Sequence, residues 1–493
     1  MSETFLRLTN PGSAALADLP VLSFSEFSSQ ALRVIRERGG RVSAFFAVPQ
    51  GAQFRLILVL ALDQEGKLLL SATDTGSEYP SLTPDCPQFH WFERELFEQH
   101  GIRPQGHPWL KPIRFNQSQN IPGVTDYFTM SGDAVHEVAV GPVHAGVIEP
   151  GHFRFQCLGE DVFSLEISLG YQHRGIEKRL IGGPDKKSIH LLETAAGDSS
   201  CSYAGAYCQI IEQLSPGRRV SDRNQALRVV AWELERIANH TGDLGALAGD
   251  VAFRPTMAYC GRLRGDFLNM TAALCGNRFG RGLIVPGGFG YEVDQTLCNK
   301  LLPWIEKTAY ELNNAADLLF NAPTVLDRFE NTGTVSAETA REIGLVGVAA
   351  RASGLQQDVR FCHPYGFYNQ LPFPLASNNS GDVLGRAQVR MGELIFSMIT
   401  VAHLLEDLPL RGKTPTKYRL SGNRIAVSLV EAWRGELCHV ALTDASGKFS
   451  SYKVVDPSFH NWFGLAMALR GEQISHFPVC NKSFNLSYCG HDL

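Results

Sequence analysis

The stretch D-R-N-Q-A-L-R-V-V-A-W-E-L-E-R-I-A-N-H-T-G-D-L, from Asp222 to Leu244, has the apolar spacing of a long helix. Asp222 is placed to accept hydrogen bonds from the first free backbone N–H groups, as an N-cap does. Similar patterns run over about 258–276, 298–320 and 381–407. Four long helices with strands on both sides predict an α+β architecture around a helix bundle. The apolar residues expected on one face of the first helix are Leu227, Val230, Leu234 and Ile237.

The first part of the chain has a different pattern. Three strand-like segments, S-A-F-F-A-V, F-R-L-I-L-V-L-A-L and K-L-L-L-S-A-T, lie between residues 43 and 75 and are separated by turn-forming residues. A helix is expected over 24–38, and a second short helix is closed by Gly101. These patterns predict a small α+β domain over 1–120, a linker over 121–136 and a large helix-bundle domain, flanked by β-strands, over 137–493.

Charge and composition exclude several classes of protein. The 493 residues carry 45 basic and 50 acidic side chains, a net charge of −5, whereas nucleic-acid binding proteins normally carry a basic excess. The chain opens without a basic segment and apolar run, which predicts no signal peptide. Apolar stretches such as 56–62 are too short to span a bilayer. The 11 cysteines form no C-x-x-C pair, which fits reduced thiols in the cytoplasm and predicts no zinc or iron–sulfur site.

Several blocks, in order along the chain, match one superfamily. They are G-P-V-H-A-G-V-I-E-P-G-H-F-R-F (141–155), L-G-Y-Q-H-R-G-I-E-K (169–178), W-E-L-E-R-I-A-N-H (232–240), E-A-W-R-G-E (431–436) and D-P-S-F-H-N-W (456–462). Together they resemble the large subunit of group 4 nickel–iron hydrogenases, as in formate hydrogenlyase, and its relative, the quinone-site subunit of complex I. W-F-E-R-E (91–95) and H-G-I-R-P-Q-G-H-P (100–108) resemble the smaller complex I subunit that is often fused in front.

The resemblance implies partners and a location. A large subunit of this kind pairs with a small iron–sulfur subunit that carries the last cluster, and it rests on antiporter-like membrane subunits. The chain would then be cytoplasmic and peripheral on the inner face of the cell membrane, held there by its partners. It would hold no cofactor itself. Its electron donor, whether formate, NADH or ferredoxin, would be set by other chains, and a quinone is a candidate acceptor.

One departure from the family pattern decides the expected chemistry. The family holds its nickel–iron centre with two C-x-x-C pairs, because soft, deprotonated sulfur is the ligand that nickel needs. Aligned on the neighbouring blocks, the four ligand positions fall on residues that carry no thiol, and no metal is expected there. These degenerate positions are Ala196, Ser199, Ser487 and Gly490.

The complex I comparison suggests a second set of site residues. Counted from the Asn-His pair at 239–240, Asp250 falls on the aspartate that contacts quinone, and His144 falls on a family histidine of the first hairpin. The family tyrosine is replaced by Gly197. Glu149 and His152 are candidate proton carriers, because the corresponding hydrogenase glutamate relays protons. The alternative for Glu149 and His152 is a hairpin held by a hydrogen bond between them.

The charged segment H-R-G-I-E-K (173–178) carries a further expectation. In the family this segment lies at the interface with the iron–sulfur subunit, where basic groups adjust the reduction potential of the neighbouring cluster. The alternative is a solvated face. For His240, which shares a helix face with Glu233 and Arg236, a structural role and a place in a proton path are equally open. The expected interface residues of the charged run are His173, Arg174, Glu177 and Lys178.

Two functional hypotheses follow. In the first, the chain is a catalytic-type subunit that has lost its nickel–iron centre and passes electrons from a partner cluster to a quinone or similar acceptor. In the second, it is a non-catalytic subunit that scaffolds the iron–sulfur protein and couples it to the membrane arm. The emptied ligand set favours the second hypothesis. The retained Glu149, His173 and Asp250 favour the first.

Overall fold

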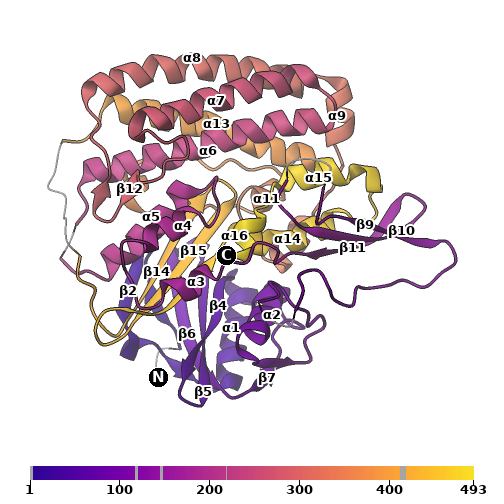
Figure 1. The fold of residues 1–493 in the computed structure, drawn as a ribbon, viewed down its shortest axis with the longest axis vertical. Coiled ribbons are helices and arrows are strands. Elements are labelled where there is room, and N and C mark those ends of the chain that lie inside the picture. Colours follow the sequence, from indigo (N-terminus) through magenta and orange to yellow (C-terminus); the bar gives the residue numbers. More distant parts are fainter. Residues whose placement is uncertain (1–3, 117–119, 145–147, 218, 373, 411–417) are drawn as a thin grey trace.

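The three strand patterns between residues 43 and 75 form a twisted sheet. The computed structural model describes residues 4–116, 120–144, 148–217, 219–372, 374–410 and 418–493, and its first sheet has the order β1-β6-β5-β4, with β3 beside β6 (Figure 1). The helix predicted over 24–38 and the one closed by Gly101 are confirmed. The elements are β1 (Leu6–Leu8), β3 (Val21–Leu22), α1 (Phe24–Arg38), β4 (Arg41–Gln50), β5 (Gln53–Leu62), β6 (Lys67–Thr75), β7 (Glu78–Pro80), α2 (His90–His100) and β8 (Arg103–Gln105).

A second sheet joins the two ends of the chain. Its order is β16-β15-β14-β2, so that β2 (Gly12–Ala15), near the N-terminus, pairs antiparallel with β14 (Arg424–Ala432). The other strands are β15 (Gly435–Thr443) and β16 (Phe449–Val455). Every residue of β15 is buried. Sequence periodicity could not reveal this pairing, because its partners lie about 410 residues apart.

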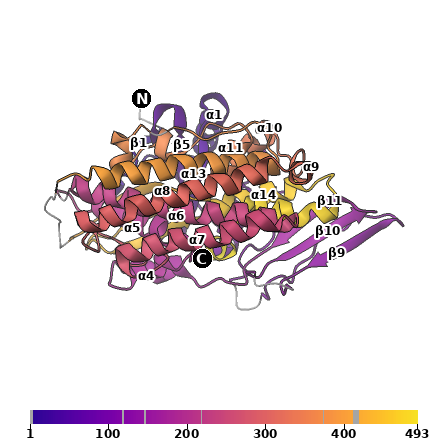
Figure 2. The ribbon, with the colours of Figure 1, turned by 90° about the horizontal axis from the view of Figure 1, so that it is seen from above.

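The predicted helix bundle is confirmed. Four long helices run side by side (Figures 1 and 2): α6 (Asp222–Asp250), α7 (Arg254–Cys275), α8 (Gln295–Phe320) and α13 (Val383–Glu406). The apolar face expected on α6 is buried. The remaining faces of α6 are largely buried as well, so Glu233, Arg236 and His240 lie inside the protein.

The predicted N-cap of α6 is wrong by one residue. Ser221 caps the helix, because its Oγ accepts a hydrogen bond from the backbone N–H of Asn224 at 3.4 Å. Asp222 is the first helical residue and pairs at the surface with Arg219. Its carboxylate still favours the helix start, because the N-terminal end of a helix carries partial positive charge.

The remaining elements frame the ends of the bundle. A three-stranded sheet of β9 (Val135–Val140), β10 (His152–Leu158) and β11 (Asp161–Ser168) projects beside the bundle (Figure 2). In the described part of the chain, no helix combines the length and apolar character that crossing a bilayer requires. The other elements are α3 (Ile176–Leu180), α4 (Ser188–Glu193), α5 (Ser200–Gln213), β12 (Ile284–Val285), β13 (Gly288–Phe289), α9 (Pro323–Phe329), α10 (Ala337–Glu342), α11 (Gly347–Ala352), α12 (Val359–Cys362), α14 (Pro457–Ala468), α15 (Phe477–Phe484) and α16 (Tyr488–Asp492).

Buried charge ties the first sheet region to the second sheet. Glu95 of α2 accepts two hydrogen bonds of 2.6 Å from Nζ of Lys453 on β16, and it also pairs with Arg114. Burial alone would raise the pKa of Glu95, but Lys453 and Arg114 outweigh it and lower the pKa from 4.5 to about 2. This cluster therefore holds the two parts together through paired charges away from water.

Removing Lys453 tests this contact. Lys453→Met should destabilise the protein by about 3–5 kcal/mol, because it leaves Glu95 buried with less countercharge. Thermal unfolding followed by tryptophan fluorescence measures the loss. The exposed Lys448→Met, in the same hairpin, is the matched control and should leave the midpoint unchanged. Because the folded pKa of Glu95 lies below 4.5, its stabilisation is complete above about pH 4.5 and is lost as the pH falls toward 2. An unchanged midpoint for Lys453→Met would contradict this account.

Candidate functional site at the degenerate metal-ligand positions

The two segments that carry the degenerate positions lie side by side. The guanidinium of Arg174 donates to the carbonyls of Thr194 (2.7 Å), Ala195 (2.8 Å) and Cys489 (3.0 Å), which bridges the loop before α5 to α16. Arg434 makes a second bridge from β14–β15. It donates to both carboxylate oxygens of Asp198, at 2.8 and 2.7 Å, and to the Asn485 carbonyl at 2.6 Å. The loop 194–199 and the segment 485–493 therefore form one site.

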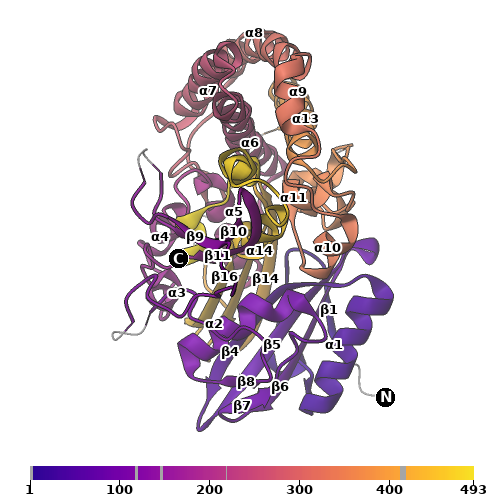
Figure 3. The same cartoon turned by 90° about the vertical axis from the view of Figure 1, so that its right-hand side faces the viewer.

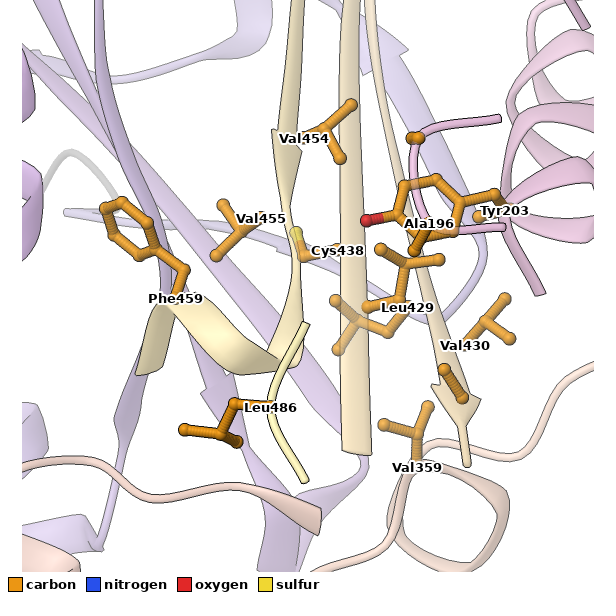
Figure 4. Packing of buried hydrophobic residues seen from close by; sticks show 14 of the residues in the cluster. Ala196, Tyr203, Val359, Leu429, Val430, Cys438, Val454, Val455, Phe459 and Leu486 are labelled. Atoms are coloured by element: carbon orange, nitrogen blue, oxygen red, sulfur yellow. The ribbon is translucent and has the colours of Figure 1, made fainter. Parts of the chain in front are cut away.

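The first pair of positions has structural roles. Ala196 is fully buried and lies beside Tyr203 above the strands of the second sheet (Figure 4). Ser199 is buried, directly precedes α5 and donates a long hydrogen bond of 3.4 Å to Asp198. The methyl group of Ala196 offers no ligand atom, and the Ser199 hydroxyl is a poor ligand for nickel.

At the second pair of positions, Ser487 and Gly490, neighbouring atoms pack too closely to leave room for a metal ligand. Ser487 Oγ accepts a hydrogen bond of 2.9 Å from the Gly490 N–H and caps α16. A Cβ atom added to Gly490 would lie 2.5 Å from Oδ2 of Asp456 and 2.9 Å from Oγ of Ser487. Asp456 is itself fixed, because it accepts from Tyr203 Oη at 2.6 Å and from the Ser458 N–H at 2.7 Å. A cysteine at 490 would have to displace this carboxylate.

The residues present do not fit a nickel–iron centre. Among the described residues, His, Cys, Asp and Glu side chains nowhere gather in a group of three or more that could hold a metal ion. Two cysteines remain near the site, Cys201 and Cys489. Burial raises the pKa of Cys201 well above its usual value and that of Cys489 to about 12, so both are protonated thiols at neutral pH.

A cavity of about 10 Å³ remains beside Asp198, with Glu235 and Asn239 in its wall. This volume is near the minimum for one water molecule. Glu235 accepts hydrogen bonds from the Cys201 N–H (2.7 Å), the Ser202 N–H (3.2 Å) and Ser202 Oγ (2.5 Å). Burial outweighs these bonds and raises the pKa of Glu235 to about 7. Sequence reasoning missed Glu235, although an acidic residue amid the apolar pattern W-E-L-E-R-I-A was a visible signal.

The two candidate proton carriers, Glu149 and His152, lie in different environments. Glu149 lies at the second segment, where its carboxylate accepts from the backbone N–H groups of Tyr488 (3.4 Å) and Cys489 (3.3 Å). His152 is buried and bonds through Nδ1 to the Gly141 carbonyl at 2.9 Å. The hydrogen bond considered between Glu149 and His152 is therefore wrong, because each side chain has a different partner.

The two residues predicted to contact quinone, His144 and Asp250, have different surroundings. His144 bonds through Nε2 to the Gly151 carbonyl at 3.2 Å, beside the hairpin. Asp250 is exposed at the last position of α6. It follows Asn239, which reaches the Asp198 carbonyl, by eleven residues, or roughly 16 Å along the helix axis. Desolvation raises the pKa of Asp250, and Lys482 of α15 opposes that rise. The role of Asp250 stays a prediction.

The charged run after β11 holds the end of the chain. His173 Nδ1 bonds to the Asp492 carbonyl at 2.7 Å. Glu177 accepts from the Val454 N–H at 2.9 Å and pairs with Lys453 at 3.1 Å. Arg174 and Lys178 are exposed at the surface. The run is thus more than a solvated face, and its expected role at an iron–sulfur partner stays a prediction.

His240 belongs to a buried ion cluster that sequence reasoning did not foresee. Its Nε2 lies 2.7 Å from Oε2 of Glu393 on α13, and its Nδ1 is buried without a hydrogen-bond partner. Burial lowers the pKa of His240 despite Glu393. The cluster combines four carboxylates with three guanidinium groups: Glu233, Asp358, Glu393 and Glu431 with Arg236, Arg351 and Arg360.

Comparisons with known proteins agree with this geometry. Residues 250–426 match the family described as the 49 Kd subunit of respiratory-chain NADH dehydrogenase, and residues 26–127 match that of its 30 Kd subunit. Formate hydrogenlyase subunit 5 of Escherichia coli (strain K12) is 27% identical over 92% of this chain and 84% of that protein. The carbon monoxide-induced hydrogenase of Rhodospirillum rubrum is 32% identical over 71% of this chain and 98% of that protein.

A solved structure shares the fold. A chain of the membrane-bound sulfane sulfur reductase, an archaeal respiratory membrane complex, has a TM-score of 0.68 at 23% identity, over 73% of this chain and 99% of that chain. Fold and family matches together define a 49 Kd-type subunit with a 30 Kd-type domain fused in front. The chain belongs to the family of group 4 hydrogenase large subunits and their complex I relatives, which confirms the resemblance, and it is a subunit of a complex of that type.

The packing at Gly490 gives a direct test. Gly490→Ala should cost about 1–3 kcal/mol, because the added methyl group must displace the Asp456 carboxylate. Gly197→Ala, in the facing loop, has no heavy atom within 4 Å of the added Cβ and is the matched control. Its expected effect is within about 0.5 kcal/mol. Thermal unfolding of the two variants measures the difference. Equal midpoints would show that position 490 has room for a side chain.

Proposed function

We propose that this chain is the large subunit of a membrane-associated, complex I-like respiratory complex that works without a nickel–iron centre. It would receive electrons from an iron–sulfur cluster in a small partner subunit and pass them to a quinone or a similar acceptor. Two electrons and two protons convert a quinone to its quinol, so the site must supply protons as well as a path for electrons. Antiporter-like membrane subunits would complete the assembly and hold this chain at the inner face of the cell membrane.

The observation that carries the proposal is the reuse of the four ligand positions. Ala196 is core, Ser199 precedes α5, Ser487 caps α16, and Gly490 packs against Asp456. At Gly490 a cysteine side chain would have to displace the Asp456 carboxylate, and at Ser487 it would replace the hydroxyl group that caps α16. Hydrogen chemistry at nickel is therefore the activity least supported by this site.

Titratable groups still form a row across the site. Glu149 faces the Cys489 backbone, and the charge of Asp198 influences the thiol of Cys489. The row continues to Glu235, across a cavity that has room for about one water molecule. A carboxyl group with a pKa near 7 exchanges protons readily at physiological pH. An acceptor is too large for this cavity, so it would be reduced on the outer side, beside Glu149, with protons supplied along this row.

The structural-subunit hypothesis is favoured by one observation. The cavity of about 10 Å³ beside Asp198 cannot hold a substrate, and the Arg434 guanidinium bridges Asp198 to the Asn485 carbonyl. Under this second hypothesis the carboxyl groups of Glu149, Asp198 and Glu235 transfer no protons to an acceptor. Substitutions in the row would then leave turnover of the complex unchanged.

Metal content and turnover of the purified complex test the first hypothesis. We expect iron from the partner cluster and less than about 0.1 nickel atom per chain, measured by plasma mass spectrometry.

We also expect the dithionite-reduced complex to reduce decylubiquinone. Glu149→Gln should slow this step about tenfold or more, because the acceptor is proposed to be reduced beside Glu149, whereas the exposed Asp327→Asn of α9 serves as the control. Stoichiometric nickel would overturn the proposal, and full turnover of Glu149→Gln would remove Glu149 from the proton supply.

A pH profile separates the two hypotheses. Glu235 is protonated below pH 7 and ionised above it, so turnover that draws on its proton should fall as the pH rises through about 7. Glu235→Gln should lower the rate at pH 6 and remove that pH dependence, while the complex still assembles on size-exclusion chromatography. Glu306→Gln, at the exposed surface of α8, is the control. An unchanged profile for Glu235→Gln would favour the scaffold.

A further inference from the structure

Figure 3 shows α2, β11 and α14 close together, and a cavity of about 690 Å³ lies between them. Two rings of its wall, Trp91 and Trp462, contact His491 and Tyr488 of α16, so the cavity adjoins the far side of the second segment. Its walls are mainly apolar and include several aromatic rings, and they come from the N-terminal part, from the linker and from the large domain. The phenylalanine and tryptophan rings in the walls are Trp91, Trp109, Phe128, Phe163, Trp462 and Phe463. A cavity of this size and character is typical of sites for small organic ligands.

A buried cation faces this cavity. Arg94 of α2 is only 6% exposed, and its guanidinium lies 4.6 Å from the centre of the Trp91 ring. It donates through Nε to the Lys111 carbonyl at 2.8 Å and through Nη2 to the Pro112 carbonyl at 2.7 Å. Nη1 has no hydrogen-bond acceptor among the described residues. No carboxylate there lies within ion-pair distance of Arg94, and burial lowers its pKa to about 10.

The other charges around the cavity do not neutralise Arg94. Glu166 also lines it, but its carboxylate is engaged by Lys111 Nζ at 2.7 Å and by the Phe128 N–H at 2.9 Å. Arg470, just beyond α14, adds an exposed second cation at the edge of the cavity, and its guanidinium has no ion pair with any described residue. The cavity therefore offers two guanidinium groups and one carboxylate that already has a cationic partner.

We propose that this cavity binds an amphipathic anion, a molecule with a carboxylate or phosphate group on an aromatic or aliphatic body. Arg94 and Arg470 pair with the acid group, because guanidinium recognises carboxylate and phosphate oxygens with two parallel hydrogen bonds. The aromatic walls cover the apolar body. The bound acid group gives Arg94 a direct ion-pair partner, whereas the carboxylates of Glu166 and Glu98 act on it only from beyond ion-pair distance and do not offset its burial. This site is independent of the electron-transfer function proposed above.

Isothermal titration of the full chain with 2-naphthoate tests the proposal. We expect one binding site per chain. The neutral analogue 2-naphthylmethanol should bind at least about tenfold more weakly, because it cannot pair with the guanidinium groups. Inorganic phosphate, which has no apolar body, should also bind at least about tenfold more weakly. Equal affinity for the acid and the alcohol would overturn the proposal. So would binding of a glutamate hexapeptide in place of naphthoate, since that result would identify a docking surface for acidic protein segments.

Variants locate the site. Arg470→Gln should weaken naphthoate binding about threefold, and Arg94→Gln about tenfold or more. Because Arg94 also holds the Lys111 and Pro112 carbonyls, Arg94→Gln could disturb the fold. Ala466→Phe avoids this difficulty, because it places a ring in the cavity and leaves both arginines intact. It should abolish binding, and because the added ring at this buried position also lowers the unfolding midpoint, a cooperative thermal transition well above the titration temperature checks that the variant is folded. Arg328→Gln, at an exposed position of α9, is the matched control. Wild-type affinity in Ala466→Phe would place the bound probe elsewhere and overturn the proposal.

Discussion

The ion pair between the buried Arg434 and the partly exposed Asp198 is the contact on which the site depends. It joins the loop before α5 to the strands of the second sheet, and the same guanidinium holds the Asn485 carbonyl and stacks on Trp433 at 3.9 Å. Burial alone would raise the pKa of Asp198, but Arg434 outweighs it and lowers the pKa. A charge pair that belongs to the chain thus bridges the loop 194–199 and the segment 485–493.

A similar constraint governs the centre of the bundle. The cluster around Arg236 contains one more carboxylate than guanidinium groups, so it is neutral only when one proton is retained. Burial and the neighbouring Asp358 raise the pKa of Glu431 to about 7, while Arg351 and other arginines keep the pKa of Glu393 well below its usual value. The retained proton therefore belongs on Glu431 or on His240, which contacts Glu393. Such a cluster fixes α6, α13 and β14 relative to one another, because no member can leave without exposing an unpaired charge.

Local pattern was enough to predict the elements but not their long-range contacts. The helices, the first three-stranded pattern and the closing Gly101 follow from periodicity and turn chemistry, so they were predicted. The β2–β14 pairing, the Lys453–Glu95 contact and the Glu393 cluster join residues hundreds of positions apart, or side chains whose burial no local pattern reveals. The sequence did predict that Ala196 and Gly490 lack ligand atoms. It could not predict that Asp456 fills the space beside Gly490.

Two arginine bridges hold the candidate site together. The guanidinium groups of Arg174 and Arg434 satisfy backbone carbonyls of the loop 194–199 and of the segment 485–493. Buried carbonyls without such partners would be costly in a protein interior. Glu149 accepts from the backbone of the second segment, and Glu235 accepts from two backbone N–H groups at the start of α5, where burial raises its pKa to about 7. An apolar residue at 235 would leave those N–H groups without an acceptor, so Glu235 both stabilises the start of α5 and is the carboxyl group of this site best suited to exchange a proton near neutral pH.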